Sequence, residues 1–173
     1  MTARCFASLV SLVSLCLLVL LPASAAAQPS AGAPMGRNLA DMTFGPVPGL
    51  PTCVSGAVQT GDPANGPTIV LSRMTAGCII PWHWHTPSEH LMLASGEARL
   101  EMKDAAPFTL KAGGFALMPA RHVHQFTCQQ ACLLYVYSDG AFDMHYVNAQ
   151  GTEITAADAL TMVKESPATL PQR

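Results

Sequence analysis

The sequence predicts an all-β protein whose antiparallel strands form a sandwich or a barrel. Apolar and β-branched residues occur in many short runs, and most of these runs are too short to form a helix. Turn-forming residues separate the runs, and only one segment, near the C-terminus, carries helix signals. Many short strands at this spacing are typical of β-sandwiches and small barrels.

The first segment, 1–27, is predicted to be a cleaved signal peptide. Arg4 provides the positive charge, and residues 6–21 form an apolar run that is shorter than the about 20 residues of a membrane-spanning helix. Ala25 and Ala27 occupy the small-residue positions of a cleavage site. We therefore expect cleavage after Ala27, in preference to Ala25, and export to the periplasm or out of the cell.

Cleavage would leave about 146 of the 173 residues, which is the size of one domain. The formal charge would change from -2 to -3, because Arg4 is the only charged residue removed. Such a chain has no basic excess for nucleic acid. The predicted organisation is a signal peptide (1–27), a Pro-rich arm (28–51), a barrel (52–150) and a C-terminal helix and tail (151–173).

The arm is rich in proline and glycine and shows little periodicity, so we expect it to be extended. After it come the predicted strands, in order 54–59, 68–75, 78–84, 89–94, 97–103, 108–110, 115–118, 122–127, 132–138 and 142–147. Thr155 is a predicted N-cap for a short helix that runs to about Lys164, with Asp158 in its first turn.

Four cysteines follow the signal peptide, and export would allow them to form disulfides. Cys128 and Cys132 flank a predicted tight hairpin loop, 129–131, across which facing residues lie close enough for a bridge. That pairing would leave Cys53 with Cys78. The other connectivities remain open, as does the alternative that these cysteines are small buried apolar residues.

The segment from Gly77 to Gly96 contains a cluster of metal-binding residue types. Its pattern is G-x5-H-x-H-x3-E-x6-G, with His83, His85 and Glu89 at the polar positions. Side chains alternate between the two faces of a strand, and these three residues share one parity, so they can point the same way. Two imidazoles and a carboxylate in one cavity suit a divalent transition metal.

A second segment, 113–124, completes a resemblance to the cupin superfamily. The first cupin motif is matched at every fixed position by the residues from Gly77 to Gly96. The second motif, G-x5-P-x-G-x2-H-x3-N, is matched at Gly113, Pro119 and His124. It departs at Arg121, where the family usually has glycine, and at Cys128, where it usually has asparagine.

The resemblance covers roughly residues 68–138 and implies an antiparallel jelly-roll barrel with one metal ion. It implies that the ion is bound by His83, His85, Glu89 and His124. Imidazole and carboxylate ligands accept iron, manganese, nickel, copper or zinc, so the donor set does not identify the metal.

Four protein ligands leave one or two coordination positions open for a substrate, as a catalytic metal requires. We expect a metal-dependent enzyme of dioxygenase, isomerase or decarboxylase type that acts on a small organic molecule. The alternatives are a non-catalytic protein that uses the metal to anchor a small ligand, and a barrel that the metal only stabilises, since cupins include all three.

Two further roles are expected for residues near the motifs. His122 shares the parity of His124 and is a candidate for proton transfer, and Glu89 is a second candidate if it leaves the metal. Trp82, Trp84 and His90 have the opposite parity and are expected on the outer face. The cupin resemblance makes a homodimer through that face an expected assembly.

Overall fold

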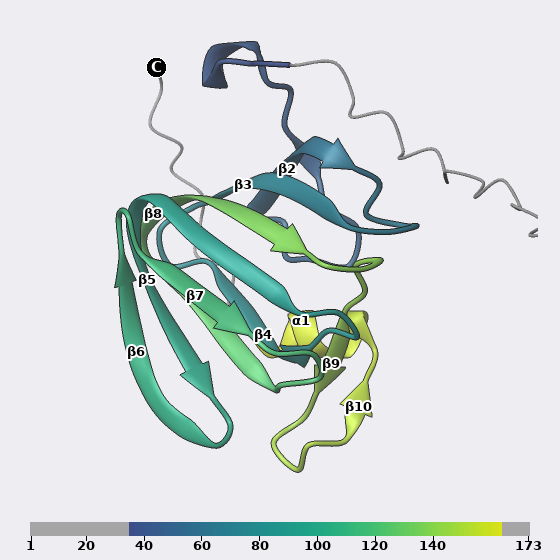
Figure 1. Ribbon diagram of the computed structural model, residues 1–173. Helices are drawn as coiled ribbons and strands as arrows, with labels where there is room; N and C mark the ends of the chain where they lie inside the picture. The colour runs from purple at the N-terminus through teal and green to yellow at the C-terminus, as the bar shows by residue number, and fades with distance from the viewer. Residues whose placement is uncertain (1–34, 164–173) are drawn as a thin grey trace, which may run out of the picture. The chain divides into compact units, whose positions relative to one another are not determined.

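Two long strands, β5 (Glu89–Met102) and β8 (His124–Ser138), pair antiparallel along their whole lengths (Figure 1). The computed structural model describes residues 35–163, and from Arg37 onward these belong to one unit. The predicted signal peptide and the tail from residue 164 lie outside the described residues. On the free edges, β8 pairs with β3 and β4, while β5 pairs with β6 and β7.

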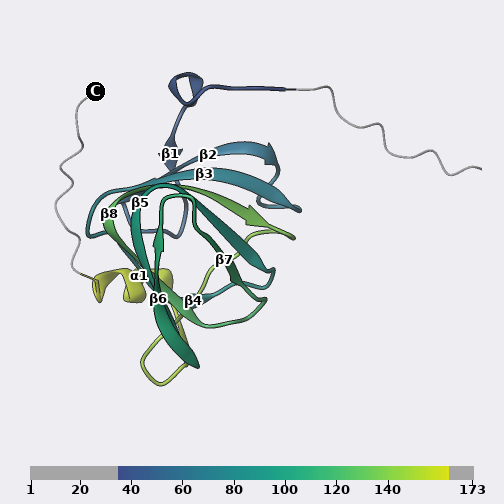
Figure 2. The same ribbon diagram turned by 60° about the vertical axis from the view of Figure 1, so that its left-hand side comes forward.

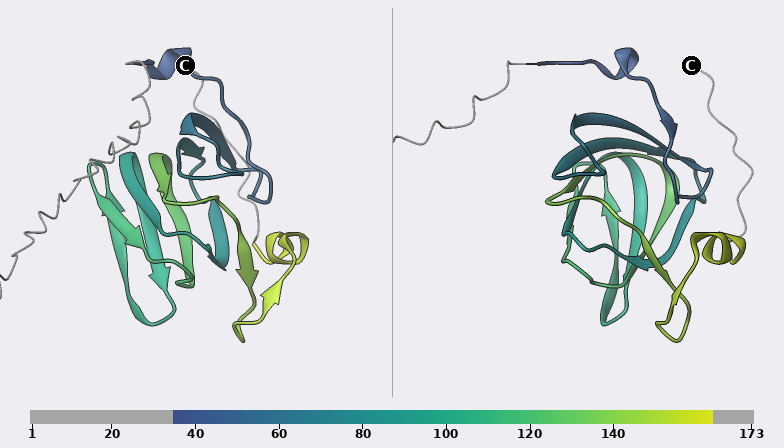
Figure 3. Two further views of the ribbon diagram at one scale, coloured as in Figure 1. Left: turned by 45° about the vertical axis from the view of Figure 1, so that its right-hand side comes forward. Right: turned by 90° about the vertical axis from the view of Figure 1, so that its right-hand side faces the viewer.

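The remaining strands extend this arrangement, and all neighbours are antiparallel. The sheet order is β1-β2-β3-β8-β4-β9-β10. The bounds are β1 Gly45–Pro46, β2 Val54–Gly61, β3 Thr68–Met74, β4 Ile79–Trp84, β6 Ala105–Lys111, β7 Phe115–Met118, β9 His145–Val147 and β10 Glu153–Ile154. The strands surround a common interior, as the end-on view in Figure 3 shows. The predicted all-β jelly-roll barrel is therefore confirmed.

The hairpin predicted at 129–131 is wrong, because residues 124–138 form the single strand β8. In the same way, the predicted strands 89–94 and 97–103 correspond to the single strand β5, which ends at Met102. The sequence signals at these places mark bulges instead, with register shifts between Leu93 and Ala98 of β5. Gly96 has a φ of 90°, and a Cβ there would lie 2.2 Å from the carbonyl oxygen of Ala131. Only glycine allows the two strands to approach this closely at the bend.

Both predicted disulfides are present, Cys53–Cys78 and Cys128–Cys132. The Cα atoms of Cys128 and Cys132 are 5.9 Å apart, whereas four residues of straight strand would span about 13 Å. The bulge in β8 therefore brings the second pair together. The first pair joins the segments that precede β2 and β4, 25 residues apart in sequence.

The interior face follows the alternation of the sequence. Along β4 and into the following loop, Pro81, His83 and His85 are buried, and at the start of β5 so are Glu89, Leu91 and Leu93. Every second residue faces inward, as a half-buried strand requires. Polar side chains thus share the inward face with the apolar core.

The helical segments are short. A 3-10 turn, η1 (Leu39–Asp41), precedes β1, and α1 (Ala156–Thr161) packs against β4 and β9 (Figure 2). Thr155 caps α1 as predicted, since its hydroxyl accepts a hydrogen bond from the backbone N–H of Asp158 (3.1 Å). The helix ends at Thr161, earlier than expected. In the part of the chain that the structure describes, no helix is long and apolar enough to cross a membrane.

Candidate metal centre

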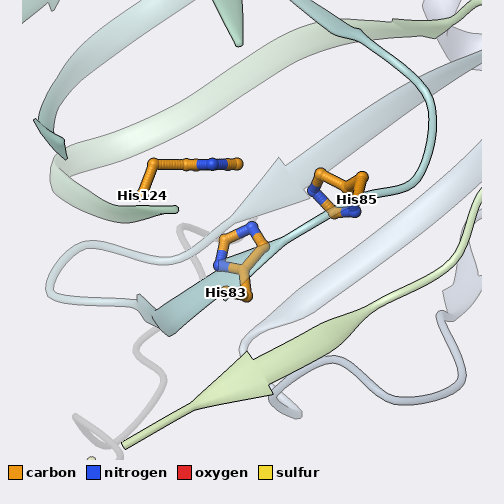
Figure 4. Close-up of side chains that lie close together, drawn as sticks. All are labelled: His83, His85 and His124. Atoms are coloured by element: carbon orange, nitrogen blue, oxygen red, sulfur yellow. The ribbon is translucent and has the colours of Figure 1, made fainter. Parts of the chain in front are cut away.

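Three buried histidines meet inside the barrel (Figure 4). His83 lies on β4, directly opposite His124 at the start of β8, and His85 follows the end of β4. One ring nitrogen from each lies within 4.8 Å of the other two. Two nitrogens bound to one ion lie at most about 4.2 Å apart, so the rings are close to the separation that a shared ion needs.

Each of these rings is held by a hydrogen bond from its Nδ1 to a backbone carbonyl oxygen. The carbonyls belong to Pro81 for His83 (2.6 Å), to Asp143 for His85 (2.5 Å) and to His122 for His124 (2.9 Å). A carbonyl only accepts, so each Nδ1 carries the proton and each Nε2 carries the lone pair. Metal-binding histidines are typically oriented in this way.

The Nε2 atom of His85 is buried and has no hydrogen-bond partner. A buried polar atom without a partner is unusual in a folded protein, because it has lost its water without compensation. A cation between the three rings would supply the missing interaction. The residues present therefore fit a metal ion on both their chemistry and their orientation.

Glu89, at the start of β5, adds a carboxylate to the cluster. Its Oε2 lies 3.7 Å from Nε2 of His85 and 3.4 Å from Nε2 of His124. Its side chain is buried as well. The structure thus brings together all four residues that the sequence predicts as ligands.

Burial sets the protonation states of the cluster. It lowers the pKa of His83 well below the usual value and also lowers the pKa of His85. Burial by itself would raise the pKa of Glu89, but His85 and His124 beside the carboxylate hold it below its usual value. At neutral pH His83 and His85 are therefore neutral and the carboxylate is ionised, the states in which they can bind a metal.

These shifts predict that acid destabilises the metal-free protein. Below about pH 6.5 the histidine at position 83 binds a proton in the unfolded chain but not when it is buried in the folded protein, so protonation favours unfolding. At lower pH Glu89 reduces the free energy of unfolding further, because its pKa is also lower in the folded protein. His145 has a raised pKa and opposes the trend, but it is largely solvated, so its effect is weaker. The urea midpoint should be lower at about pH 5 than at about pH 7.5.

The matched variant is His83→Gln, in which the fall between the two pH values should be smaller. An equal or higher midpoint at the acidic pH for the wild-type protein would contradict this account of the buried cluster.

A loop that the sequence did not single out positions His85. Asp143 accepts the Nδ1 hydrogen of His85 with its carbonyl, and its carboxylate accepts the backbone N–H of Thr86 (2.7 Å). The Phe142 ring lies 4.5 Å from the His85 ring, measured between centroids. Residues 142–147 were predicted as one strand, but β9 begins only at His145, and the preceding residues form this loop. No local pattern marks these contacts, because they join residues 57 and 58 positions apart.

Asp143→Ala keeps the backbone carbonyl that holds Nδ1 of His85 but removes the carboxylate that fixes this loop to the backbone N–H of Thr86. Because the carbonyl would then be less well placed, metal binding is expected to weaken by about 10-fold, the lower end of the 10–100-fold that partners of a ligand typically contribute. Asp139→Ala is the matched control, because Asp139 anchors Ser88 through the same type of hydrogen bond (2.8 Å) but holds no histidine. Calorimetric titration with cobalt(II) measures both variants. An equal loss of affinity in the two would show that Asp143 has no specific effect on the site.

In the turn before β8, Arg121 stands where the cupin motif usually has glycine, and its backbone adopts a conformation that glycine favours. Arg121 is the only non-glycine residue of the described range with positive φ, at 62°. Its backbone N–H donates to the carbonyl of His85 (2.8 Å), and its guanidinium lies 5.2 Å from the centre of the Trp84 ring. The half-buried His122 follows in this turn and holds His124 through its carbonyl. Its own ring does not line the cavity described next.

A cavity of about 210 Å³, here called the chamber, occupies the barrel interior. His83, Glu89 and His124 line it, and most of the other lining residues are apolar. The outward-facing Trp84 does not reach it and instead stacks on His145, with ring centroids 3.8 Å apart. The histidine cluster therefore opens on a largely apolar space of the size of a small organic molecule.

Comparison with known proteins supports the family resemblance. The sequence profile described as "Cupin domain" matches residues 70–137. Among curated proteins, no sequence is detectably similar to this chain.

Several solved structures share the fold. A proposed acetylacetone dioxygenase from Methylibium petroleiphilum is 16% identical, with a TM-score of 0.56 over 74% of this chain and 90% of that one. An RmlC-like cupin from Ralstonia eutropha is 19% identical, with a TM-score of 0.55 over 72% and 80%. A DMSP lyase structure is 22% identical, with a TM-score of 0.49, and the match spans 55% of this chain and only 53% of the lyase. At these identities the first two likenesses concern the fold alone.

Proposed function

The chain has the cupin fold, with a cupin domain over residues 70–137, and we propose that it is a metal-dependent enzyme acting on a small organic molecule. One observation carries the proposal. Three buried imidazoles lie close together, and each Nδ1 donates a hydrogen bond to a backbone carbonyl oxygen. The lone pair of each Nε2 is therefore available to bind an ion.

In this proposal His83, His85, Glu89 and His124 hold one divalent transition metal ion. A bound ion would polarise a carbonyl or phenolic oxygen in an open coordination position, which is the chemistry shared by dioxygenases, isomerases and decarboxylases of this type. The apolar chamber would exclude bulk water and orient the rest of the molecule. Glu89 is the proposed proton acceptor, because its carboxylate lines the chamber.

The proposed proton-transfer role of His122 rests on its place in the turn beside His124. His122→Ala should then slow turnover by about 10²-fold or more while metal content stays at the wild-type level. Turnover at the wild-type rate in this variant would remove His122 from the mechanism.

A second candidate is a non-catalytic protein that binds a small ligand through the metal. The observation that favours it is the composition of the chamber, where the titratable lining residues of the described chain are three of the four proposed ligands. A dedicated acid or base, which many enzymes place beside the substrate, is not among them.

Metal analysis followed by oxygen uptake separates these candidates. The purified protein, reloaded in turn with iron, manganese, nickel, copper and zinc, is supplied with a panel of small acids, sugars and phenols, and oxygen and products are monitored. One metal ion per chain and turnover of at least one compound are expected. Full metal loading without turnover of any compound would favour the binding protein, and failure to bind any metal would refute both candidates.

Export and dimer formation complete the proposal. The two disulfides suit an oxidising compartment, either the periplasm or the outside of the cell. The proposed homodimer would use the outer face, where Trp82 and Trp84 are half-buried and His90 packs 5.3 Å from the Tyr137 ring. Light scattering at micromolar concentration should give twice the monomer mass.

A further inference from the structure

Resting on this proposed metal centre, we propose a substrate class and the element that selects it. The substrate is a compact apolar molecule with one acidic oxygen group, such as a carboxylate, an enol or a phenol. The strap, defined as residues 46–50, closes the chamber over the apolar end of this molecule and limits its length.

The chamber has a single place for a charged group. Among the described residues that line it, none is Lys or Arg, and the titratable ones are His83, Glu89 and His124. Thr68, Ser72 and Ser138 also line it, but their hydroxyls are neutral, and those of Thr68 and Ser138 already donate to backbone carbonyls (2.9 and 2.8 Å). A second charge on the substrate would lose hydration and find no opposite charge among these lining residues.

The charge of the centre selects a monoanion. A divalent ion would contribute two positive charges, and the Glu89 carboxylate, whose Oε2 lies 3.7 Å from Nε2 of His85 and 3.4 Å from Nε2 of His124, would remove one. Histidine binds a metal ion as the neutral imidazole, so one positive charge would remain in an apolar site, where charges interact strongly. A single acidic oxygen group on the metal would neutralise it.

The volume limits the apolar body. A cavity of about 150 Å³ holds one benzene ring, so the about 210 Å³ of the chamber corresponds to about eight non-hydrogen atoms. A single ring with a short substituent fits this space, and a fused bicyclic acid does not.

The strap forms one wall of the chamber, contributed by Pro46, Val47, Pro48 and Leu50. It begins at Pro46, which pairs with Ser55 of β2, and Val47 lies directly on β2 because Gly56 has no side chain. A Cβ at Gly56 would be 2.9 Å from Cγ2 of Val47.

Tyr146 fastens the strap to the metal side of the barrel. Its hydroxyl donates to the carbonyl oxygen of Gly49 (2.7 Å), and its ring centroid lies 6.0 Å from that of His83. Gly49 has a φ of 80°, a turn conformation that glycine adopts without strain. The strap is thus a fixed wall of the chamber.

The first test compares benzoate with terephthalate, which differs only by a second carboxylate at the far end of the ring. Both are titrated calorimetrically into the cobalt(II)-loaded wild-type protein. Benzoate should bind, and terephthalate should bind at least about 100-fold more weakly, because its second carboxylate would face the apolar wall.

Equal affinities, or no binding of benzoate to the cobalt-loaded protein, would overturn the inference and leave the metal centre intact. Failure of cobalt(II) itself to bind would overturn the proposed function, and the inference with it. The two failures are therefore distinguishable.

The second test concerns the strap. Leu50→Ala lengthens the chamber, so the affinity for 4-tert-butylbenzoate relative to benzoate should rise at least about 10-fold. Leu39→Ala is the matched control, because Leu39 belongs to the same arm but is 42% exposed and does not line the chamber. Thermal unfolding checks that both variants fold. An unchanged ratio in a folded Leu50 variant, or the same rise in the Leu39 variant, would overturn the role of the strap.

Discussion

Replacing His124 with alanine is expected to weaken binding of a divalent metal ion by at least about 100-fold and to abolish any metal-dependent activity. Residues that only orient a ligand contribute 10–100-fold, and His124 offers a ligand atom itself. His83, His85 and Glu89 remain, so loose binding of metal should persist. Calorimetric titration with cobalt(II) measures the loss, and circular dichroism checks that the barrel still forms.

The matched control is His90→Ala. His90 is the neighbour of Glu89 on β5, but it points to the outer face, where its ring lies 6.0 Å from that of Phe115. Metal affinity should be unchanged in this variant. Wild-type affinity in the His124 variant would remove His124 from the site, and an equal loss in both variants would point to a general destabilisation.

Removing the Cys53–Cys78 disulfide by alanine substitutions should lower the free energy of unfolding by about 3.5 kcal/mol, because the bridge closes a loop of 25 residues. For a domain of this size the Tm would fall by about 10 °C. The bridge also fixes the segment that leads from the strap into β2. Its removal should therefore also loosen the wall that the strap forms on the chamber.

The Cys128–Cys132 bridge provides the comparison. It spans only four positions, and the same relation gives about 2 kcal/mol for its removal. Urea unfolding of the two double variants measures both values. A larger loss for the short bridge would show that strand geometry at the bulge, and not restriction of the unfolded chain, determines these contributions.

The parts of the site that follow from local patterns could be predicted from the sequence. Alternation along a strand predicted the common direction of His83, His85 and Glu89, and Thr155 marked the start of α1. The approach of His124 was predicted only through the family resemblance, since it depends on the pairing of β4 with β8.

Long-range contacts explain what the sequence did not reveal. Tyr146 reaches Gly49 across 97 positions, and Asp143 reaches His85 across 58. Such contacts leave no periodic signal, because each depends on where the barrel brings two distant segments together. The bends of β5 and β8 were likewise predicted as chain reversals, since Gly96 and the polar residues at 129–130 serve bulges as well as turns.

The most direct test of the account is an anomalous-scattering map from crystals of the protein soaked in cobalt(II). We expect one strong peak inside the barrel, at about 2.1 Å from Nε2 of each of His83, His85 and His124, with the Glu89 carboxylate beside it. A map without a peak between the three rings, or with cobalt bound only elsewhere on the chain, would contradict the assignment of this cluster as a metal centre.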